Sequence, residues 1–258
     1  IVTVDFAGQS CQMEKIKKLS LKYNFKIIED ASHAIGGEYR DSKIGSCEYS
    51  DITVFSFHPV KIITTGEGGM AVTNNKDLAE LMSQLRSHGI TRNKKLMIRK
   101  NPELYHYEQI NLGFNYRMSD IVAALGISQL SQIIPFVKKR NEIAKKYNEL
   151  LTDLPLKLPT ITDECLSTFH LYVVRLVTEK CSITHNELFH SLRKKGIGVN
   201  LHYEPIHLHP YYANMGFKKG DYPEAEKYSS EAISLPIYVS LSDDEQTKVV
   251  NQLREIIY

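Results

Sequence analysis

The stretch SFHPVKIITTGEGG, residues 56–69, is the feature around which the rest of the chain is organised. It joins an apolar, strand-like run at 52–57 to a second one at 70–73 through a loop that contains Lys61 and three glycines. A lysine beside a strand end can lose its proton more readily when its hydration is reduced, and can then act as an amine nucleophile or base. Solvation at the surface is the ordinary alternative for a lysine.

Strands and helices alternate on both sides of this stretch. Strand-like runs at 1–4 and 25–28 are separated by an amphipathic pattern at 13–23, and a helix is predicted from about 76 to 87. Such alternation predicts an α/β protein with a parallel sheet, in which functional residues gather at the carboxyl ends of strands. Asp30 is expected at such an end.

The middle of the chain predicts a long connection followed by helices. Residues 91–112 lack clear periodicity and are interpreted as a connection. An apolar helix is predicted at 121–130, with Ser119 or Asp120 as its cap. Pro135 interrupts the pattern, and a charged helix then continues to about residue 151.

Prolines at 155 and 159 mark a domain boundary, which predicts a large domain at 1–151 and a small α+β domain at 152–258. In the second domain we expect strands at 171–177 and 199–201 and helices at 185–195, 224–233 and after residues 242–244. Thr184 is the candidate cap of the first of these helices.

Composition excludes several classes of function. The 258 residues contain 32 Lys and Arg against 30 Asp and Glu, and this net charge of +2 does not predict nucleic-acid binding. No apolar run reaches the length of a membrane helix, so no membrane association is predicted. The four scattered cysteines suggest neither a zinc site nor a disulfide framework, and they fit a reducing cytoplasm.

Each candidate site residue has an ordinary interpretation beside a functional one. Asp30 either caps the following turn or holds a proton on a heteroaromatic nitrogen. His33 is either a core histidine or a contact to a cofactor. Ser56 either caps the strand end or donates to a phosphate, and the glycines either supply positive φ or admit a ligand.

Taken together, these groups are the set that pyridoxal 5'-phosphate (PLP) requires. A lysine forms a Schiff base with the aldehyde, an acid keeps the pyridine nitrogen protonated, and a hydroxyl helps to hold the phosphate. The glycines follow neither the G-x-G-x-x-G pattern nor the Walker pattern, so they do not indicate a nucleotide-binding fold.

Three ordered motifs, EDASHAIGG (29–37), the 56–69 stretch and GFNYRMSD (113–120), resemble the DegT/DnrJ/StrS family of PLP-dependent nucleotide-sugar aminotransferases. The similarity runs over the whole chain. It implies a fold type I, aspartate aminotransferase-like protein: a partial large domain with a mixed, mostly parallel sheet, and a small C-terminal α+β domain. The family's N-terminal part, which contributes to the cofactor pocket, is expected to lie outside this sequence, in agreement with the strand-like run that opens it.

The resemblance implies a role for each matching residue in the first two motifs. Asp30 matches the acid that pairs with the pyridine nitrogen, and His33 matches a residue near the phenolic oxygen of the cofactor. Ser56 matches a phosphate ligand, and Lys61 matches the Schiff-base lysine.

Further residues match positions that contact a partner subunit or the substrate. Asn115 matches an asparagine that reaches the phosphate of the partner's cofactor, which implies a homodimer with shared active sites. Arg117 is expected near the phosphates of the sugar nucleotide, and His202 and Tyr203 near the substrate edge of the neighbouring site. The three histidines and the glutamate of residues 200–210 have no spacing that enforces a metal geometry, so no metal is predicted.

The implied activity is transfer of an amino group from L-glutamate to C4 of a UDP-linked 4-keto-6-deoxy sugar. Another UDP- or dTDP-linked keto sugar is an alternative substrate. Family members that are dehydratases carry histidine in place of the lysine, and Lys61 argues against that activity. A non-catalytic relative and a plain sugar-nucleotide binder also remain open.

Overall fold

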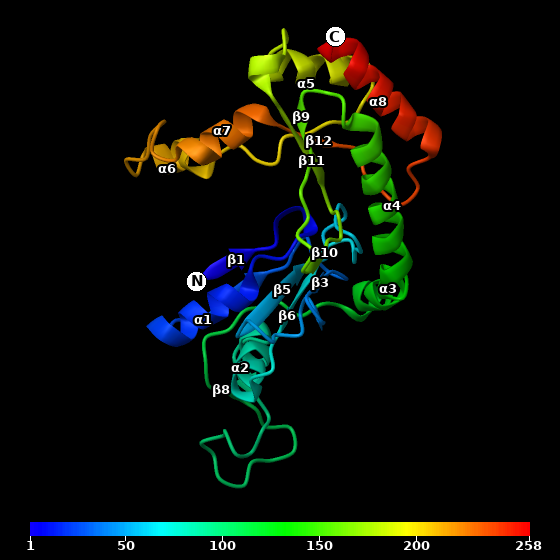
Figure 1. Ribbon diagram of the computed structural model, residues 1–258. Coiled ribbons are helices and arrows are strands. Elements are labelled where there is room, and N and C mark those ends of the chain that lie inside the picture. The colour runs from blue at the N-terminus through cyan, green and yellow to red at the C-terminus, as the bar shows by residue number, and fades with distance from the viewer. The chain divides into compact units, whose positions relative to one another are not determined.

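The computed structural model describes residues 1–258. The chain forms two compact units (Figure 1): Ile1–Phe6 with Ser10–Ile133, and Ala7–Gln9 with Ile134–Tyr258. A short 3₁₀ turn, η1 (Phe6–Gly8), spans the point where the chain passes from one unit to the other.

The first unit contains, in chain order, β1 (Val2–Val4), α1 (Met13–Tyr23), β2 (Ile28–Asp30), β3 (Glu38–Tyr39), β4 (Ser42–Lys43), β5 (Ile52–Ser56), β6 (Gly69–Val72), α2 (Lys76–Arg86), β7 (Ile90–Thr91), β8 (Glu108–Gln109) and α3 (Asp120–Leu130). The second contains α4 (Ile133–Leu151), which begins at the last residue of the first, then β9 (Leu156–Lys157), β10 (Cys165–Leu166), β11 (Tyr172–Leu176), η2 (Thr178–Lys180), α5 (His185–Lys194), η3 (Ile206–Leu208), α6 (Pro210–Ala213), α7 (Pro223–Glu231), β12 (Ala232–Leu235) and α8 (Asp243–Ile257).

The central sheet of the first unit has the strand order β1-β2-β5-β6 (Figure 1). β1, β2 and β5 are parallel, with Val4 beside Asp30 and Asp30 beside Val54, whereas β6 runs antiparallel to β5. The sheet is therefore mixed and mostly parallel, as predicted. Because parallel strands end at the same edge, Asp30 and Ser56 lie at one edge of this sheet.

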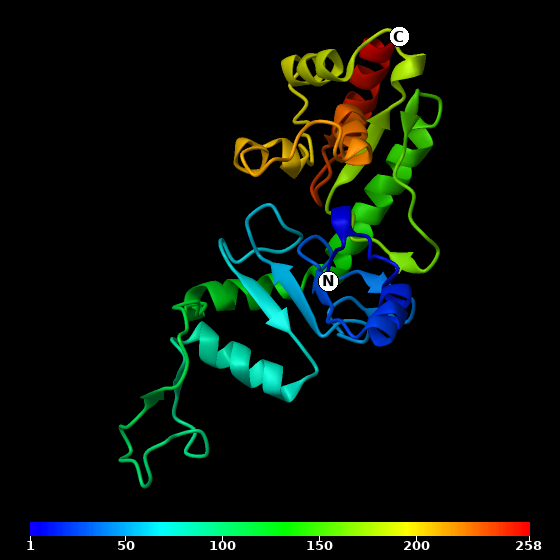
Figure 2. The ribbon, with the colours of Figure 1, turned by 90° about the vertical axis from the view of Figure 1, so that its left-hand side faces the viewer.

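Helix predictions in the first unit are confirmed closely, and strand predictions less so. α1 has the predicted bounds and α3 begins after Ser119, which is its N-cap. The second strand lies at residues 28–30 and not at 25–28, because only 28–30 pair with β1 and β5. The connection at 91–112 contains the short β7–β8 pair, from which a long excursion extends (Figure 2).

The second unit is built around an antiparallel sheet of order β12-β11-β9. Apolar residues of α4, α5 and α8 form one buried core with β11 and β12. Tyr147 and Leu151 of α4 are completely buried in this core. The compact units accordingly divide between Ile133 and Ile134, earlier than the predicted domain boundary at residue 151. Pro135 is tolerated in α4 because it lies in the first helical turn, where its missing N–H has no intrahelical partner.

Two predictions in the second unit are wrong. The helix expected at 224–233 ends at Glu231, because residues 232–235 are buried and pair with β11 as strand β12. The strand expected at 199–201 is reduced to a single bridge between Asn200 and Ser234. The predicted cap Thr184 is confirmed, and it forms a capping box with Glu187.

No single helix is long and apolar enough to cross a membrane, and only α3 and α4 taken together pass that test of length and composition.

The capping box of α8 yields a stability prediction. Ser242 Oγ accepts a hydrogen bond from Glu245 N, so Ser242→Ala leaves that amide without its partner. We expect the free energy of unfolding to fall by about 1 kcal/mol, measured by urea denaturation. Ser230→Ala is the matched control, since Ser230 is exposed and its hydroxyl bonds only to Lys227 O within α7. An equal loss in both variants would contradict this role of the cap.

Candidate active site

The lysine loop begins where β5 ends. Ser56 is the last residue of β5, and its Oγ accepts a hydrogen bond from His58 N at 3.4 Å. Lys61 N then donates to His58 O at 2.9 Å, so the chain turns immediately after the strand. Thr65 N donates to Phe57 O at 3.0 Å, which returns the loop to the strand end. These bonds fix the backbone around Lys61.

The glycines of the loop have different structural roles. Gly66 has a φ of +82°, a conformation that side chains rarely adopt, and open space surrounds its Cα. Gly68 has an ordinary φ, but a Cβ there would lie 2.4 Å from Thr65 Oγ1 and 2.8 Å from Met118 Cε. One glycine is therefore required by backbone conformation and the other by close packing.

Asp30 and Lys61 interact electrostatically at the strand ends. Asp30 ends β2, and its Oδ1 accepts a hydrogen bond from Ser32 N at 3.0 Å. Burial lowers the pKa of Lys61 below its usual value, and the negative charge of Asp30 opposes this shift without cancelling it. Lys61 forms no salt bridge, so its half-buried amine is available for chemistry. The structure thus brings together the predicted acid and the predicted lysine.

His33 lies in the turn that follows Asp30. It is buried, and its ring centroid lies 6.0 Å from that of Phe6 at an interplanar angle of 51°. Phe6 directly follows Asp5, which lies at the carboxyl end of β1, and so this aromatic contact belongs to the same edge of the sheet.

The motif at 113–120 runs alongside the end of α2. Phe114 N donates to Leu85 O, Tyr116 N donates to Arg86 O, and Asn115 forms a bridge with Ser87. Asn115 and Arg117 are exposed, and no contact joins them to Asp30, Ser56 or Lys61. The structure therefore does not place these two residues with the rest of the predicted site.

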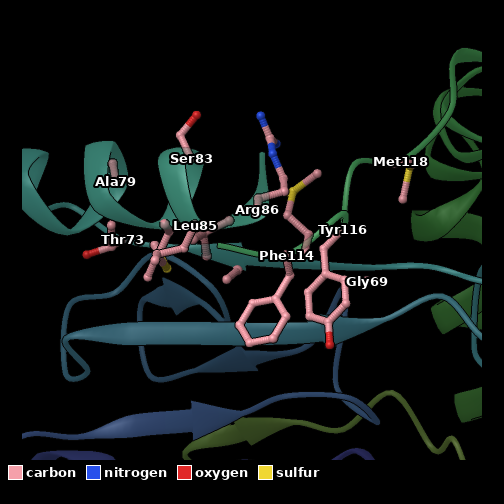
Figure 3. A pocket seen from close by; sticks show the side chains of 13 residues that line it. Gly69, Thr73, Ala79, Ser83, Leu85, Arg86, Phe114, Tyr116 and Met118 are labelled. Atoms are coloured by element: carbon pink, nitrogen blue, oxygen red, sulfur yellow. The ribbon is translucent and has the colours of Figure 1, made fainter. Parts of the chain in front are cut away.

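A cavity of about 660 Å³ lies between α2 and β6 (Figure 3). The stacked rings of Phe114 and Tyr116, whose centroids are 4.9 Å apart, contribute to its wall. Apolar groups dominate the lining, which includes neither Lys61 nor Asp30. The cavity is therefore separate from the reactive groups.

His202 and Tyr203 belong to the second unit. His202 Nδ1 shares a hydrogen bond with Ser234 Oγ at 2.8 Å, and its carbonyl accepts one from Tyr228 Oη at 3.0 Å. The two neighbouring rings are edge to face, and Tyr203 is half exposed. Hydrogen bonds to His202 from two other elements thus fix the position of this pair within its unit.

Asp5 is a residue at this edge of the sheet that the sequence motifs do not single out. Asp5 is completely buried and directly follows β1, one residue beyond Val4, which pairs with Asp30. An acid that follows a strand-like run is the signal that could have identified it.

The groups at this edge of the sheet fit PLP in their chemistry. Asp30 is a carboxylate at a strand end, Ser56 is a hydroxyl at the end of the adjacent parallel strand, and Lys61 is an amine with a lowered pKa within the field of Asp30.

Comparisons with known proteins identify the class. The structure of Helicobacter pylori PseC, "aminotransferase involved in the biosynthesis of pseudoaminic acid", matches with a TM-score of 0.89 and 32% identity, over 100% of this chain and 66% of that chain. The fold class predicted from the sequence, PLP-dependent transferase fold type I, is confirmed. The profile of the DegT/DnrJ/EryC1/StrS aminotransferase family matches residues 1–254, and the chain belongs to this family.

Curated relatives are similar over the whole chain. An uncharacterized Methanocaldococcus jannaschii protein, MJ1066, is 42% identical over 259 residues. The UDP-4-amino-4,6-dideoxy-N-acetyl-beta-L-altrosamine transaminase of Campylobacter jejuni serotype O:23/36 is 38% identical over 259 residues. Both matches cover 100% of this chain, which spans 66% and 65% of the length of these relatives.

The close backbone contact between Gly113 and Gly89, beside α2, yields a second prediction. A Cβ on Gly113 would lie 2.2 Å from Gly89 N and 2.6 Å from His88 C, and these are backbone atoms that a rotamer change cannot move. Gly113→Ala is expected to cost roughly 1–3 kcal/mol of stability. The measurement is the thermal unfolding midpoint.

Gly198→Ala provides the control for this substitution, because Gly198 has an ordinary φ and no atom within 4 Å of an added Cβ. If the thermal unfolding midpoint of Gly113→Ala equals that of the control, the backbone contact between Gly113 and Gly89 is not tightly packed.

Proposed function

We propose that the complete protein is a PLP-dependent aminotransferase that moves an amino group from L-glutamate to C4 of a UDP-linked 4-keto-6-deoxy sugar. The finer assignment is the amination step of pseudaminic acid biosynthesis, for cell-surface or flagellar glycans. The names of the Campylobacter relative and of PseC support this substrate class.

The observation that carries the proposal is the electrostatic influence of Asp30 on the half-buried Lys61. A half-buried lysine with a lowered pKa beside a strand-end carboxylate is the arrangement that attachment of an aldehyde cofactor needs. Lysine at this position also argues against the dehydratases of the family, which carry histidine there.

Bound PLP supplies an electron sink that makes the proton on the amino-acid carbon removable. Lys61 would attach the cofactor, and its released amine would carry that proton. Asp30 would hold a proton on the pyridine nitrogen, Ser56 would donate a hydrogen bond to the phosphate, and the buried His33 would lie near the phenolic oxygen.

Other residues would act across subunits. We propose a homodimer in which Asn115 reaches the phosphate of the partner subunit's cofactor and Arg117 lies near the phosphates of the sugar nucleotide. Exposure of both side chains leaves them available for this role. His202 and Tyr203 would contact the substrate edge of the neighbouring site. None of the four cysteines forms a disulfide, which fits the proposed cytoplasmic location.

Lys61→Ala in the complete protein tests the proposal directly. Without the amine, the visible absorbance band of lysine-bound PLP should be absent, and amination should fall by at least about 10²-fold. Lys76→Ala is the matched control, since Lys76 is exposed on α2 and pairs only with Glu80. The assay uses glutamate with a panel of UDP- and dTDP-linked 4-keto sugars. Absence of the band from the wild-type protein supplied with PLP would refute the mechanism.

Asp30→Asn tests whether the charge of Asp30 is needed for amino transfer but not for attachment of the cofactor. The amide keeps the size of the side chain and can still accept a hydrogen bond from Ser32 N, but it lacks the charge that holds a proton on the pyridine nitrogen. We expect the absorbance band to persist while kcat falls by roughly 10²-fold or more. Unchanged kcat in this variant would remove Asp30 from the mechanism.

A further inference from the structure

A polar cluster is buried on the face of the sheet opposite to Asp30. Thr3, Glu29 and Thr53 occupy one register across β1, β2 and β5, so their side chains point to the same face. Asp5 lies two residues after Thr3 and continues that side of the chain. Because neighbouring residues of a strand alternate, Asp30 points to the other face.

Asp5 and Glu29 are both removed from solvent. Asp5 is 0% exposed and Glu29 is 6% exposed. The Asp5 backbone N–H donates to Asp30 O at 3.0 Å, which places Asp5 directly beside the end of β2. Two acidic side chains therefore share a low-dielectric environment next to the proposed cofactor acid.

The hydrogen bonds of these two carboxyl groups are not equivalent. Asp5 Oδ1 accepts from Cys11 N at 3.1 Å, whereas Asp5 Oδ2 is buried and receives no hydrogen bond. Glu29 Oε2 accepts from Thr53 Oγ1 at 2.6 Å and from Ser50 Oγ at 3.4 Å. Glu29 thus has donors that stabilise a negative charge, and Asp5 Oδ2 has none.

The charged groups that act on Asp5 are both negative. Glu29 lies within hydrogen-bonding reach, and Asp30 acts from the other face of β2, while the loop after β1 contributes only the backbone N–H of Cys11. Burial, followed by the charge of Glu29, raises the pKa of Asp5 to about 8. Asp5 Oδ2 has no hydrogen-bond donor beside it, and its neighbour Glu29 is a carboxylate. This oxygen is therefore best satisfied when it carries a proton itself.

We propose that Asp5 is a neutral carboxylic acid in the folded protein, that it donates its proton to Glu29, and that this pair is a positioning element behind Asp30. The shared proton joins the ends of β1 and β2 and leaves one negative charge where two would repel. Its importance for Asp30 rests on the proposed function, but the shared proton itself does not.

Asp5→Asn tests this assignment through the pH dependence of stability. The amide can still accept from Cys11 N and donate to Glu29, but it does not titrate. In the wild type, the folded state keeps a proton that the unfolded state loses above about pH 4, so stability falls as pH rises towards 8. The folding equilibrium constant of the wild type, divided by that of the variant, should fall by up to roughly tenfold per pH unit in this window.

Thr3→Val is the matched control, because Thr3 is buried in the same cluster and does not titrate. The folding equilibrium constant of the wild type, divided by that of Thr3→Val, should not change with pH. A pH-independent ratio for Asp5→Asn would overturn the proposal. The complete protein is used without cofactor, so this outcome is distinguishable from failure of the aminotransferase assignment.

A second measurement covers the case in which Asp5→Asn does not fold. The side-chain carboxyl carbon of Asp5 can be followed by NMR in the wild-type protein during a pH titration. A transition near pH 8 supports the shared proton, and a transition below pH 5 overturns it.

Discussion

Parallel pairing of β1, β2 and β5 is the constraint on which the candidate site depends. Because these strands end at one edge, residues from three distant parts of the sequence meet there: Asp5, Asp30 and Ser56. β6 then returns antiparallel to β5, so the intervening loop must turn sharply and leave Lys61 at the same edge. Sheet topology therefore assembles the site, and the side chains supply its chemistry.

Burial and charge act in opposite directions on Lys61, and burial is the stronger. Desolvation disfavours the ammonium form, whereas Asp30 favours it, and the pKa is lowered on balance. A direct salt bridge with Asp30 would have reversed this balance and kept the lysine protonated. Asp30 therefore acts on Lys61 through its charge, without a direct bond to the amine.

Features that depend on residues three or four positions apart could be predicted from the sequence. The bounds of α1 and the cap at Thr184 belong to this group. β12 could not be predicted, because its strand conformation depends on pairing with β11, about 60 residues earlier.

In the candidate site, too, some features follow from the local sequence and others depend on distant strand pairing. Asp30, Ser56 and Lys61 could be named from their motifs, but only the strand order places them at one edge. The burial of Asp5 also depends on its neighbours across the sheet, so its local sequence does not identify it.

The two units bury charge in different ways, and the available hydrogen-bond partners decide which way is used. Arg140 is buried in the second unit, where its Nη1 donates to the carbonyls of Phe169, Ile237 and His170 at 3.0, 3.2 and 3.4 Å. Burial lowers the pKa of Arg140 to about 10, so the guanidinium remains charged at neutral pH and bonds to two backbone segments, at residues 169–170 and at Ile237. Asp5 has one backbone donor and an adjacent carboxylate, so a proton is the remaining means of satisfying Oδ2. The second unit therefore satisfies a buried charge with backbone carbonyls, whereas in the first unit Asp5 lies beside another carboxylate and its Oδ2 has no donor.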